Sequence, residues 1–297
     1  MDFSNPNVEV VKKDEPNKES NLETNLETNE LSVEEIDKWM DESINLDSQF
    51  CCLITGTDGT GKSGLALSYL TDEDIKNDIC CIIVDLDDGN KPLISMNHKE
   101  KCDKYNKEWQ KVYRVVNPQM HKIVNGNIEI DYQRTIAKIR GVINWARAKQ
   151  KEYKIKFIIF DGLSKALKYC EYFMRMEKSI MPDGGIATRF WLIRNKMFLE
   201  TLDLIKALPM SKFFIGHENF VLKTDGENSS VIEITNAMMH QKIHCKREND
   251  FKGIKFVARI DKSKYKVVEE GKEYIICEVK EGKASEWKGY EVLKNLL

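Results

Sequence analysis

Short apolar runs and helical periodicities alternate along the chain after residue 48. Runs rich in Ile, Val, Phe and Cys predict buried β-strands at residues 49–55, 79–86, 111–116, 154–161 and 211–217. Apolar residues at three- to four-residue spacing predict helices at residues 62–70, 131–149 and 187–208. Continuous apolar strands separated by helices are typical of a parallel sheet that helices cover on both faces. We therefore expect an α/β fold whose core spans residues 48–230.

The pattern changes after residue 231. Strand-like segments follow one another with almost no helix between them, at residues 231–235, 241–248, 254–260 and 273–279. Residues 250–253 have the composition of a hairpin turn. We expect residues 231–297 to form an antiparallel, β-rich edge of the same domain.

The first 47 residues differ from the rest. Residues 1–31 contain few large apolar side chains and a tandem NLETNLETNE, so they bury too little surface to offset ordering entropy and are predicted to be a disordered acidic leader. Residues 32–44 combine a Ser32–Glu35 capping box with apolar residues at helical spacing. This predicts an amphipathic helix within residues 32–47 that docks on the core or on a neighbouring subunit.

The charge is divided unevenly along the chain. The first 50 residues hold 4 of the 46 Lys and Arg and 14 of the 48 Asp and Glu, so the remaining residues carry a net charge of +8 although the whole chain carries −2. A mildly basic body permits contact with nucleic acid, and a solvated lysine-rich surface explains the same charge.

Composition also constrains the compartment. The eight cysteines form no CxxC pair, and several lie inside apolar runs, so we expect buried reduced thiols rather than disulfides. No window reaches the ~18 apolar residues of a membrane helix, and the polar start lacks the apolar block of a signal peptide. We expect an intracellular, cytoplasmic protein without a membrane partner.

Residues 56–63, GTDGTGKS, match the phosphate-binding pattern G-x-x-x-x-G-K-[ST] between a predicted strand and a predicted helix. Such a loop wraps backbone N–H groups around phosphates at a helix N-terminus. Lys62 is placed to reach the β- and γ-phosphates of ATP, and Ser63 to bind Mg²⁺. The candidate nucleotide-binding residues are Gly56, Thr57, Asp58, Gly59, Thr60, Gly61, Lys62 and Ser63.

Carboxylates end two of the predicted strands. Asp161 closes the apolar run at residues 154–161, where burying its charge favours a metal partner, so we predict that it holds Mg²⁺ with Ser63. The strand at 79–86 is followed by Asp87 and Asp88. Hydrolysis needs a group that orients and deprotonates the attacking water, and we favour Asp87 for that role.

Taken in order, these segments resemble the RecA-type branch of P-loop ATPases, which includes RecA, RadA, KaiC and hexameric helicases. Within that branch they are most similar to small phage and archaeal RecA-like ATPases linked to single-strand annealing and recombination. The likeness spans about residues 48–265. It implies a Mg²⁺-dependent ATP hydrolase that works as a homo-oligomeric ring or filament and binds DNA, preferentially single-stranded.

The resemblance also implies roles for single residues. VDLD at residues 84–87 places Asp87 where the family has its catalytic glutamate, one methylene longer, and leaves Asp88 as an alternative. His217, ending FFIGH, corresponds to the sensor of the γ-phosphate. Lys262 and Lys264 resemble a basic pair presented to the ATP site of the next subunit, with Arg259 as the fallback.

Two loops then face the ring or filament axis, at residues 176–189 and 218–230. In them Lys178, Arg189 and Lys223 are candidates for contacts with DNA phosphates, and Phe220 is a candidate for stacking on a base.

Three alternatives remain. A KaiC-like, nucleotide-gated module would bind a protein partner through residues 1–45. A small-molecule kinase would need an arginine-bearing lid, for which only the loop with Arg175, Arg189 and Arg194 qualifies. A zinc site at residues 240–245, HQKIHC, is disfavoured because strand-like alternation separates its two histidines by ~13 Å.

Overall fold

A computed structural model describes residues 34, 49–181, 184–217, 235–251, 253–280, 283–285 and 287–296. The chain divides into two units, Met1–Asn45 and Leu46–Leu297. In the first unit residue 34 is helical, while the predicted acidic leader and the remainder of the predicted helix at 32–47 lie outside the described residues. The account below concerns the second unit.

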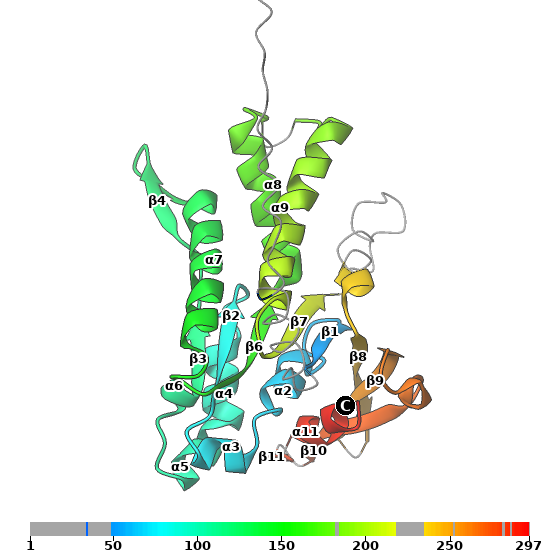
Figure 1. Ribbon diagram of the computed structural model, residues 1–297. Coiled ribbons are helices and arrows are strands. Elements are labelled where there is room, and N and C mark those ends of the chain that lie inside the picture. Colours follow the sequence, from blue (N-terminus) through cyan, green and yellow to red (C-terminus); the bar gives the residue numbers. More distant parts are fainter. Residues whose placement is uncertain are drawn as a thin grey trace, which may run out of the picture. The chain divides into compact units, whose positions relative to one another are not determined.

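The described part of this unit contains a nine-stranded sheet with the order β11-β10-β9-β8-β1-β7-β6-β2-β3 (Figure 1). Its strands are β1 (Cys51–Gly56), β2 (Cys80–Asp85), β3 (Tyr113–Val116), β6 (Ile155–Asp161), β7 (Ser211–His217), β8 (Gln241–Asp250), β9 (Gly253–Ser263), β10 (Glu273–Lys280) and β11 (Lys283–Ala284). The strands predicted before residue 220 all form, and β1, β2, β6 and β7 are buried along almost their whole length, as their continuous apolar runs predict.

Six neighbouring strands, from β3 to β8, run parallel, and β9, β10 and β11 add antiparallel pairs beyond β8. The hairpin of β8 and β9 closes with Asp250 opposite Gly253, where a turn is predicted. This arrangement confirms the predicted α/β class, a mostly parallel sheet between helices with an antiparallel C-terminal edge. The strand predicted at residues 231–235 falls mostly outside the described residues, and residues 235–238 are helical rather than extended.

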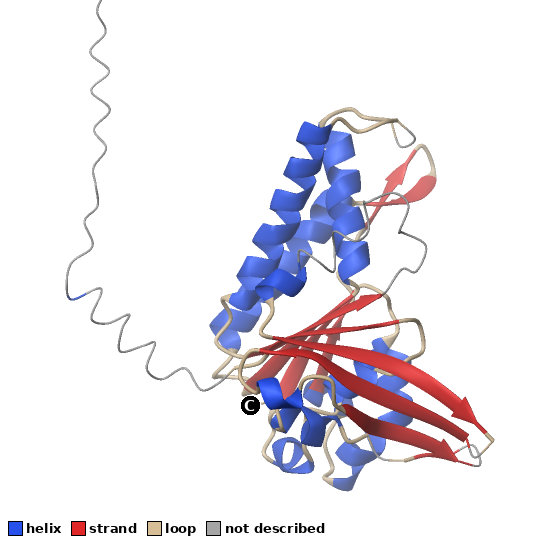
Figure 2. Cartoon of the chain, turned by 90° about the vertical axis from the view of Figure 1, so that its right-hand side faces the viewer, coloured by secondary structure: helices blue, strands red, loops and turns tan. Residues whose placement is uncertain are grey.

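Helices cover both faces of the sheet (Figure 2). One face carries α2 (Lys62–Leu67), α3 (Asp72–Lys76), α4 (Asn90–Asn97), α5 (Lys99–Lys104), α6 (Trp109–Val112) and α11 (Gly289–Lys294), and the other carries α7 (Tyr132–Lys149), α8 (Leu163–Glu177) and α9 (Thr188–Lys206). A short 3₁₀ helix, η1 (Val267–Glu269), follows β9. Each face has its own buried apolar cluster, so the sheet is the central layer of three.

The helices on the second face pack on the sheet through stripes of apolar residues. In α7 the buried residues Ile136, Ile139 and Ile143 recur at helical spacing, and the Asp131 side chain caps the helix by accepting from Arg134 N at 3.0 Å. Helix α8 has no prediction in the sequence, although its apolar stripe is buried. The connected ends of α8 and α9 extend away from the sheet (Figures 1 and 2).

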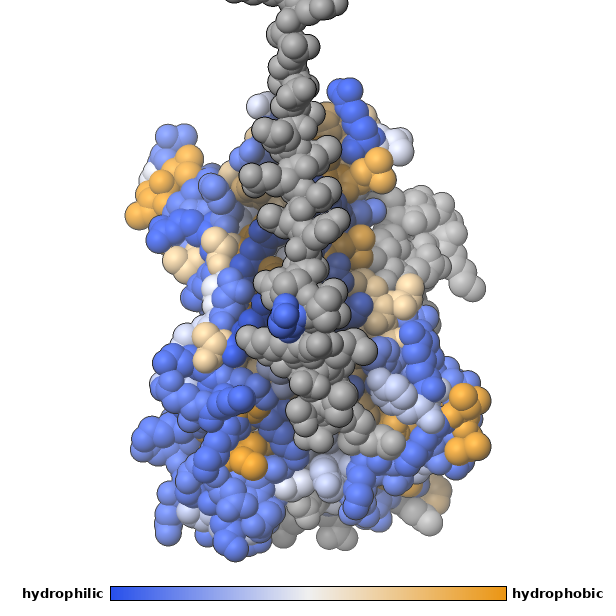
Figure 3. All heavy atoms as spheres, viewed as in Figure 1, coloured by the Kyte–Doolittle hydropathy of each residue, from blue (hydrophilic) through white to orange (hydrophobic). Residues whose placement is uncertain are grey.

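A small hairpin, also without a sequence prediction, precedes α7. Strands β4 (His121–Val124) and β5 (Asn127–Ile130) are joined by Asn125 and Gly126, both with positive φ, as a two-residue hairpin turn requires. Ile123 and Ile128 face each other across the strands and are 78% and 76% exposed. They belong to the apolar patch that Figure 3 shows over this hairpin, on a mostly hydrophilic face.

All eight cysteines are free and buried, as the sequence predicts. Among the described residues no helix has both the length and the apolarity to cross a membrane.

Candidate functional site

The carboxyl ends of the parallel strands bring the predicted site residues to one edge of the sheet. In the register, Gly56 of β1 lies opposite His217 of β7, and Asp161 of β6 lies opposite Asp85 of β2. Ligands of open α/β sheets bind outside this edge. Segments that are separated by up to 160 residues in the sequence therefore converge here.

The phosphate loop leaves β1 through a glycine that no larger residue can replace. Gly56 has a φ of 146°, and a Cβ on it would lie 2.3 Å from the Cys245 carbonyl oxygen. Gly61 adopts a left-handed conformation with a φ of 87° and caps the N-terminus of α2. Inside the loop the Thr60 hydroxyl donates to the Thr57 carbonyl at 2.8 Å. The loop thus has the compact form that the glycine spacing predicts.

Lys62 lies over the loop that it is predicted to serve. Its Nζ donates to the carbonyls of Gly56 at 3.0 Å and Thr57 at 2.6 Å, and the residue is 5% exposed. Burial lowers the pKa of the ammonium below its ordinary value, and nearby carboxylates oppose that shift. A phosphate oxygen would be a stronger partner for this charge than the two neutral carbonyls.

Ser63 and Asp161 meet as the magnesium prediction requires. The Ser63 hydroxyl donates to Asp161 Oδ2 at 2.8 Å, and Asn90 Nδ2 donates to the same oxygen at 2.9 Å. Burial raises the pKa of the Asp161 carboxyl, and the charges of Asp85 and Asp87 raise it further. Asn90 Oδ1 is also buried and has no hydrogen-bond partner among the described residues. A hydroxyl, a carboxylate and an orphaned amide oxygen fit the oxygen ligands that Mg²⁺ prefers.

The acidic residues after β2 separate into distinct environments. Strand β2 ends at Asp85, so Asp87 and Asp88 lie beyond the strand. Asp85 is fully buried and accepts from the backbone N–H of Asn90 at 2.9 Å, which holds the start of α4. Asp87 lines the cavity at the phosphate loop. Asp88 is exposed, with a φ of 57°, and does not line it, so the geometry favours Asp87 over Asp88.

His217 connects the phosphate loop to Asp87. Its Nε2 lies 3.1 Å from Asp87 Oδ2, and its Nδ1 lies 2.6 Å from Asp58 Oδ1. The hydrogen bond to Asp87 raises the pKa of the imidazole, and the same bond, with help from Lys165, lowers the pKa of the Asp87 carboxyl. Lys165 Nζ lies 3.1 Å from Asp87 Oδ1. This lysine has no local sequence signal.

A cavity of about 420 Å³ joins these groups. Its polar part is formed by the phosphate loop with Asp87, Asp161 and His217. Its apolar part comes from segments that the sequence did not connect to the site, namely Leu93 of α4, Phe256 of β9, Val279 of β10 and Trp287. The volume is in the range of small-molecule and cofactor sites.

The predicted basic pair is at the other end of the sheet. Gln241, at the start of β8, pairs with Cys52 on one side and Ser263 on the other, so Lys262 and Lys264 lie near the amino end of β1. Four residues of extended strand, ~13 Å, separate this position from Gly56. Lys262 Nζ donates to the Asn236 carbonyl at 2.8 Å. The pair therefore does not serve the phosphate loop of its own chain, and its role in trans stays a prediction.

The structure also locates Arg259, the alternative to the lysine pair, and two of the loop residues predicted to contact DNA. Arg259 donates to Asp261 Oδ1 at 2.8 Å. Lys178 and Arg189, near the connected ends of α8 and α9, are exposed. The loop at 218–230, with Phe220 and Lys223, lies outside the described residues.

The residues of the disfavoured zinc site and of the arginine-bearing lid make ordinary structural contacts. Strand β8 begins at Gln241, so residues 241–245 are extended as their alternation predicts, and His240 Nδ1 lies 2.6 Å from the Tyr265 hydroxyl. Arg175 Nε donates to Glu171 at 3.0 Å, and Arg194 lies over the Trp191 ring.

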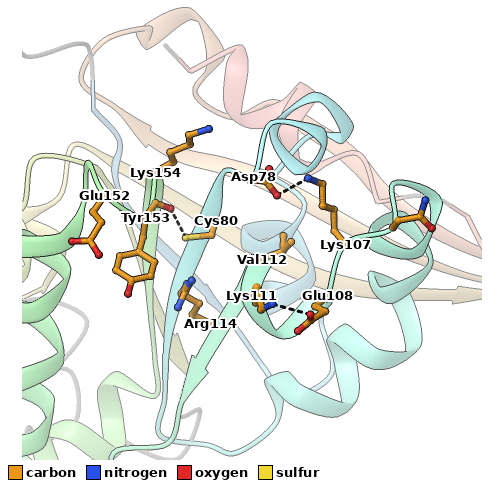
Figure 4. A pocket seen from close by; sticks show the side chains of 11 residues that line it. Asp78, Cys80, Lys107, Glu108, Lys111, Val112, Arg114, Glu152, Tyr153 and Lys154 are labelled. Carbon is orange, nitrogen blue, oxygen red and sulfur yellow. Dashed lines mark hydrogen bonds and ion pairs between the residues drawn. The ribbon is translucent and has the colours of Figure 1, made fainter.

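A second cavity, of about 360 Å³, lies at the amino end of β2 (Figure 4). Lys107 and Lys111 at its wall form ion pairs with Asp78 and Glu108. The Cys80 thiol donates to the Tyr153 carbonyl at 3.1 Å, and burial raises its pKa. The thiol is unreactive because burial keeps it protonated, and both lysines already have carboxylate partners.

No protein-family model matches the sequence, and no curated protein matches it. Among solved structures the chain is similar to a KaiC-like protein of the hyperthermophilic archaeon Pyrococcus horikoshii OT3. The sequence identity is 15% and the TM-score 0.45, over 79% of this chain and 88% of that one. A likeness at this level carries no information about function, which has to come from the residues of the chain itself.

Proposed function

We propose that the chain is a Mg²⁺-dependent ATP hydrolase of RecA type that acts on single-stranded DNA in recombination, annealing or replication. One observation carries the catalytic part of the proposal. A single cavity is lined by the phosphate loop with Lys62, by Asp161 bonded to Ser63, and by Asp87 paired with His217. A triphosphate needs a cation for its charge, ligands for its metal ion and a base for the attacking water, and these groups supply all three.

In this proposal Lys62 exchanges the two loop carbonyls for oxygens of the β- and γ-phosphates. Its present contacts, at 3.0 and 2.6 Å, show that the ammonium is already at the loop and needs only a change of partner. The backbone N–H groups between Gly59 and Ser63 bind the phosphate chain, as the left-handed glycines allow.

Ser63 and Asp161 are the residues that would hold Mg²⁺, with the Asn90 amide oxygen beside them. The ion would neutralise charge on the phosphates and offset the burial that chiefly raises the Asp161 pKa, together with the smaller repulsion by Asp85 and Asp87. The hydrogen bond between Ser63 and Asp161 keeps these two ligands together before the ion arrives.

Asp87 is the proposed base. Its lowered pKa keeps the carboxyl ionised at neutral pH, so that it is able to orient a water molecule and accept a proton. His217 is the proposed sensor, because it touches both Asp87 and Asp58 of the phosphate loop. It also ends β7 directly before residues 218–230, so a change at the γ-phosphate would be transmitted to that loop.

The assignment to DNA and to an oligomer has separate support. The body after residue 50 carries a net charge of +8, and the exposed Lys178 and Arg189 are near the connected ends of α8 and α9. Lys262 and Lys264 are too far from the phosphate loop of their own chain to act there, which leaves a neighbouring subunit as the place for a catalytic role.

The test is the ATPase rate of the purified chain with and without single-stranded DNA, together with the mass of the assembled particle. We expect Mg²⁺-dependent hydrolysis that DNA stimulates, and we expect Lys62→Ala to abolish it. Hydrolysis that neither single- nor double-stranded DNA changes, by a protein that neither retains, would refute the DNA assignment. In that case binding of a protein partner that depends on residues 1–45 would favour the KaiC-like alternative.

A further inference from the structure

The lining of the cavity at the phosphate loop is part polar and part apolar. Lys62, Asp161, Asp87 and His217 supply polar groups, whereas Leu93, Phe256, Val279 and Trp287 supply apolar ones. Triphosphates account for the polar residues only. The apolar residues need an explanation of their own, because Phe256 and Trp287 lie against Gly61 of the loop.

Trp287 is the largest of these apolar residues. Its indole lies directly on the first turn of α2, since a Cβ built on Gly64 would be 2.5 Å from Trp287 Cη2, and one built on Gly61 would be 3.1 Å from the same atom. No side chain therefore separates the ring from the loop. The Phe256 ring lies beside it, with centroids 5.4 Å apart and planes inclined by 33°.

The indole also has an unused polar group. Trp287 Nε1 is buried and has no hydrogen-bond acceptor among the described residues. Buried indole N–H groups usually find a partner, but this nitrogen is closed off from the cavity. Trp287 therefore offers a ligand the carbon atoms of its ring.

We propose that Trp287, with Phe256 and Val279, forms the site for the aromatic base of the bound nucleotide. The inference rests on the proposed function, in which the phosphates of the same ligand occupy the loop. The base stacks on the Trp287 and Phe256 rings, which lie against each other beside the phosphate loop. The C-terminal segment thus selects nucleotides over simple polyphosphates.

The experiment compares two ligands, a non-hydrolysable ATP analogue and inorganic tripolyphosphate, by isothermal titration calorimetry with Mg²⁺. Both contain the phosphate chain, and only the first has a base. The variants are Trp287→Leu, which removes the aromatic face, and Trp287→Phe, which keeps a ring and removes the N–H. Trp145→Phe is the matched control, since Trp145 lies on α7, 37% exposed, against Tyr153.

We expect Trp287→Leu to weaken binding of the analogue by about 5- to 150-fold, the equivalent of ~1–3 kcal/mol of stacking on one base. Trp287→Phe should lose less, and tripolyphosphate should bind all three proteins with the same affinity. Far-UV circular dichroism and the urea midpoint of each variant show whether it is folded.

Each contrary result has a separate meaning. If Trp287→Leu binds the analogue as the wild type does, the base site is wrong and the proposed ATPase stands. If it weakens both ligands equally, Trp287 supports the loop and does not hold the base, which also overturns the inference. If the wild type binds neither ligand, both the inference and the proposed function fail.

Discussion

Gly64 offers a direct test of how the C-terminal segment packs on the phosphate loop. The perturbation is Gly64→Ala, which adds one methyl group to the first turn of α2. That methyl carbon would lie 2.5, 2.6 and 2.7 Å from three carbons of the Trp287 ring. Carbon atoms in contact prefer ~3.5–4.0 Å, so the ring has to move by about 1 Å.

The magnitude is the difference of two effects. Overpacking of this kind costs ~1–3 kcal/mol, while replacing a helical glycine by alanine gains ~0.8–1.0 kcal/mol. We therefore expect Gly64→Ala to lower the free energy of unfolding by up to ~2 kcal/mol. Gly141→Ala is the matched control, because Gly141 lies within α7 and a Cβ there meets nothing within 4 Å. This variant should gain the full ~0.8–1.0 kcal/mol.

Urea unfolding, monitored by circular dichroism, measures the change in the free energy of unfolding for both variants. Gly64→Ala and Gly141→Ala are then also made in a Trp287→Ala background. Without the indole, Gly64→Ala should become stabilising, as Gly141→Ala is. If Gly64→Ala already stabilises the wild type as much as Gly141→Ala does, Trp287 does not pack on α2. The base site proposed above would lose its main structural support with that result.

Four further predictions concern residues with proposed roles in ATP binding and hydrolysis. Lys62→Ala should weaken ATP binding by about 10- to 150-fold in calorimetry, the equivalent of the ~1.5–3 kcal/mol of a charged hydrogen bond; unchanged affinity would refute its role. Asp161→Asn should leave ATP binding in EDTA unchanged and remove Mg²⁺-dependent turnover; a variant that still turns over with Mg²⁺ would exclude Asp161 as a ligand. His217 has a pKa raised above 6.5 by its bond to Asp87, so the pair stabilises the fold fully below that pH and less as the pH rises through the raised value. The difference in urea midpoint between wild type and His217→Gln should therefore shrink toward alkaline pH, and a constant difference would contradict the ion pair. Finally, Lys264→Ala protein mixed with Lys62→Ala protein should regain ATPase activity if the lysine acts in trans, and no recovery would argue against it.

The elements of the core could be predicted because their signals are local. Apolar runs and helical periodicity mark strands and helices within a few residues, and the phosphate loop has its glycines, lysine and serine in one octapeptide. The order of the motifs was enough to place Asp161 and His217 at the same edge. The sheet register then brings their ends together.

The remaining parts of the site depend on contacts that no local pattern encodes. Asn90 and Lys165 are polar residues of helices, and only the meeting of β2 with β6 places them beside Asp161 and Asp87. Trp287 lies 223 positions after Gly64, and nothing in its own segment indicates that its ring covers the phosphate loop. Asp88 shows that a motif can also suggest a residue that the fold does not use. Its position made it an alternative base, but in the turn after β2 the residue is exposed to solvent.

The separation of the phosphate loop from Lys262 and Lys264 has a consequence for assembly. If these lysines act in trans, the surface that lends them and the surface that receives them are different parts of the subunit, and a head-to-tail contact joins such surfaces in series. In an open polymer one terminal subunit then keeps an incomplete site, whereas a closed ring has no such end. Turnover per subunit would rise with polymer length in the first case and would change in a single step at ring closure in the second, so a dilution series of the ATPase rate distinguishes the two architectures.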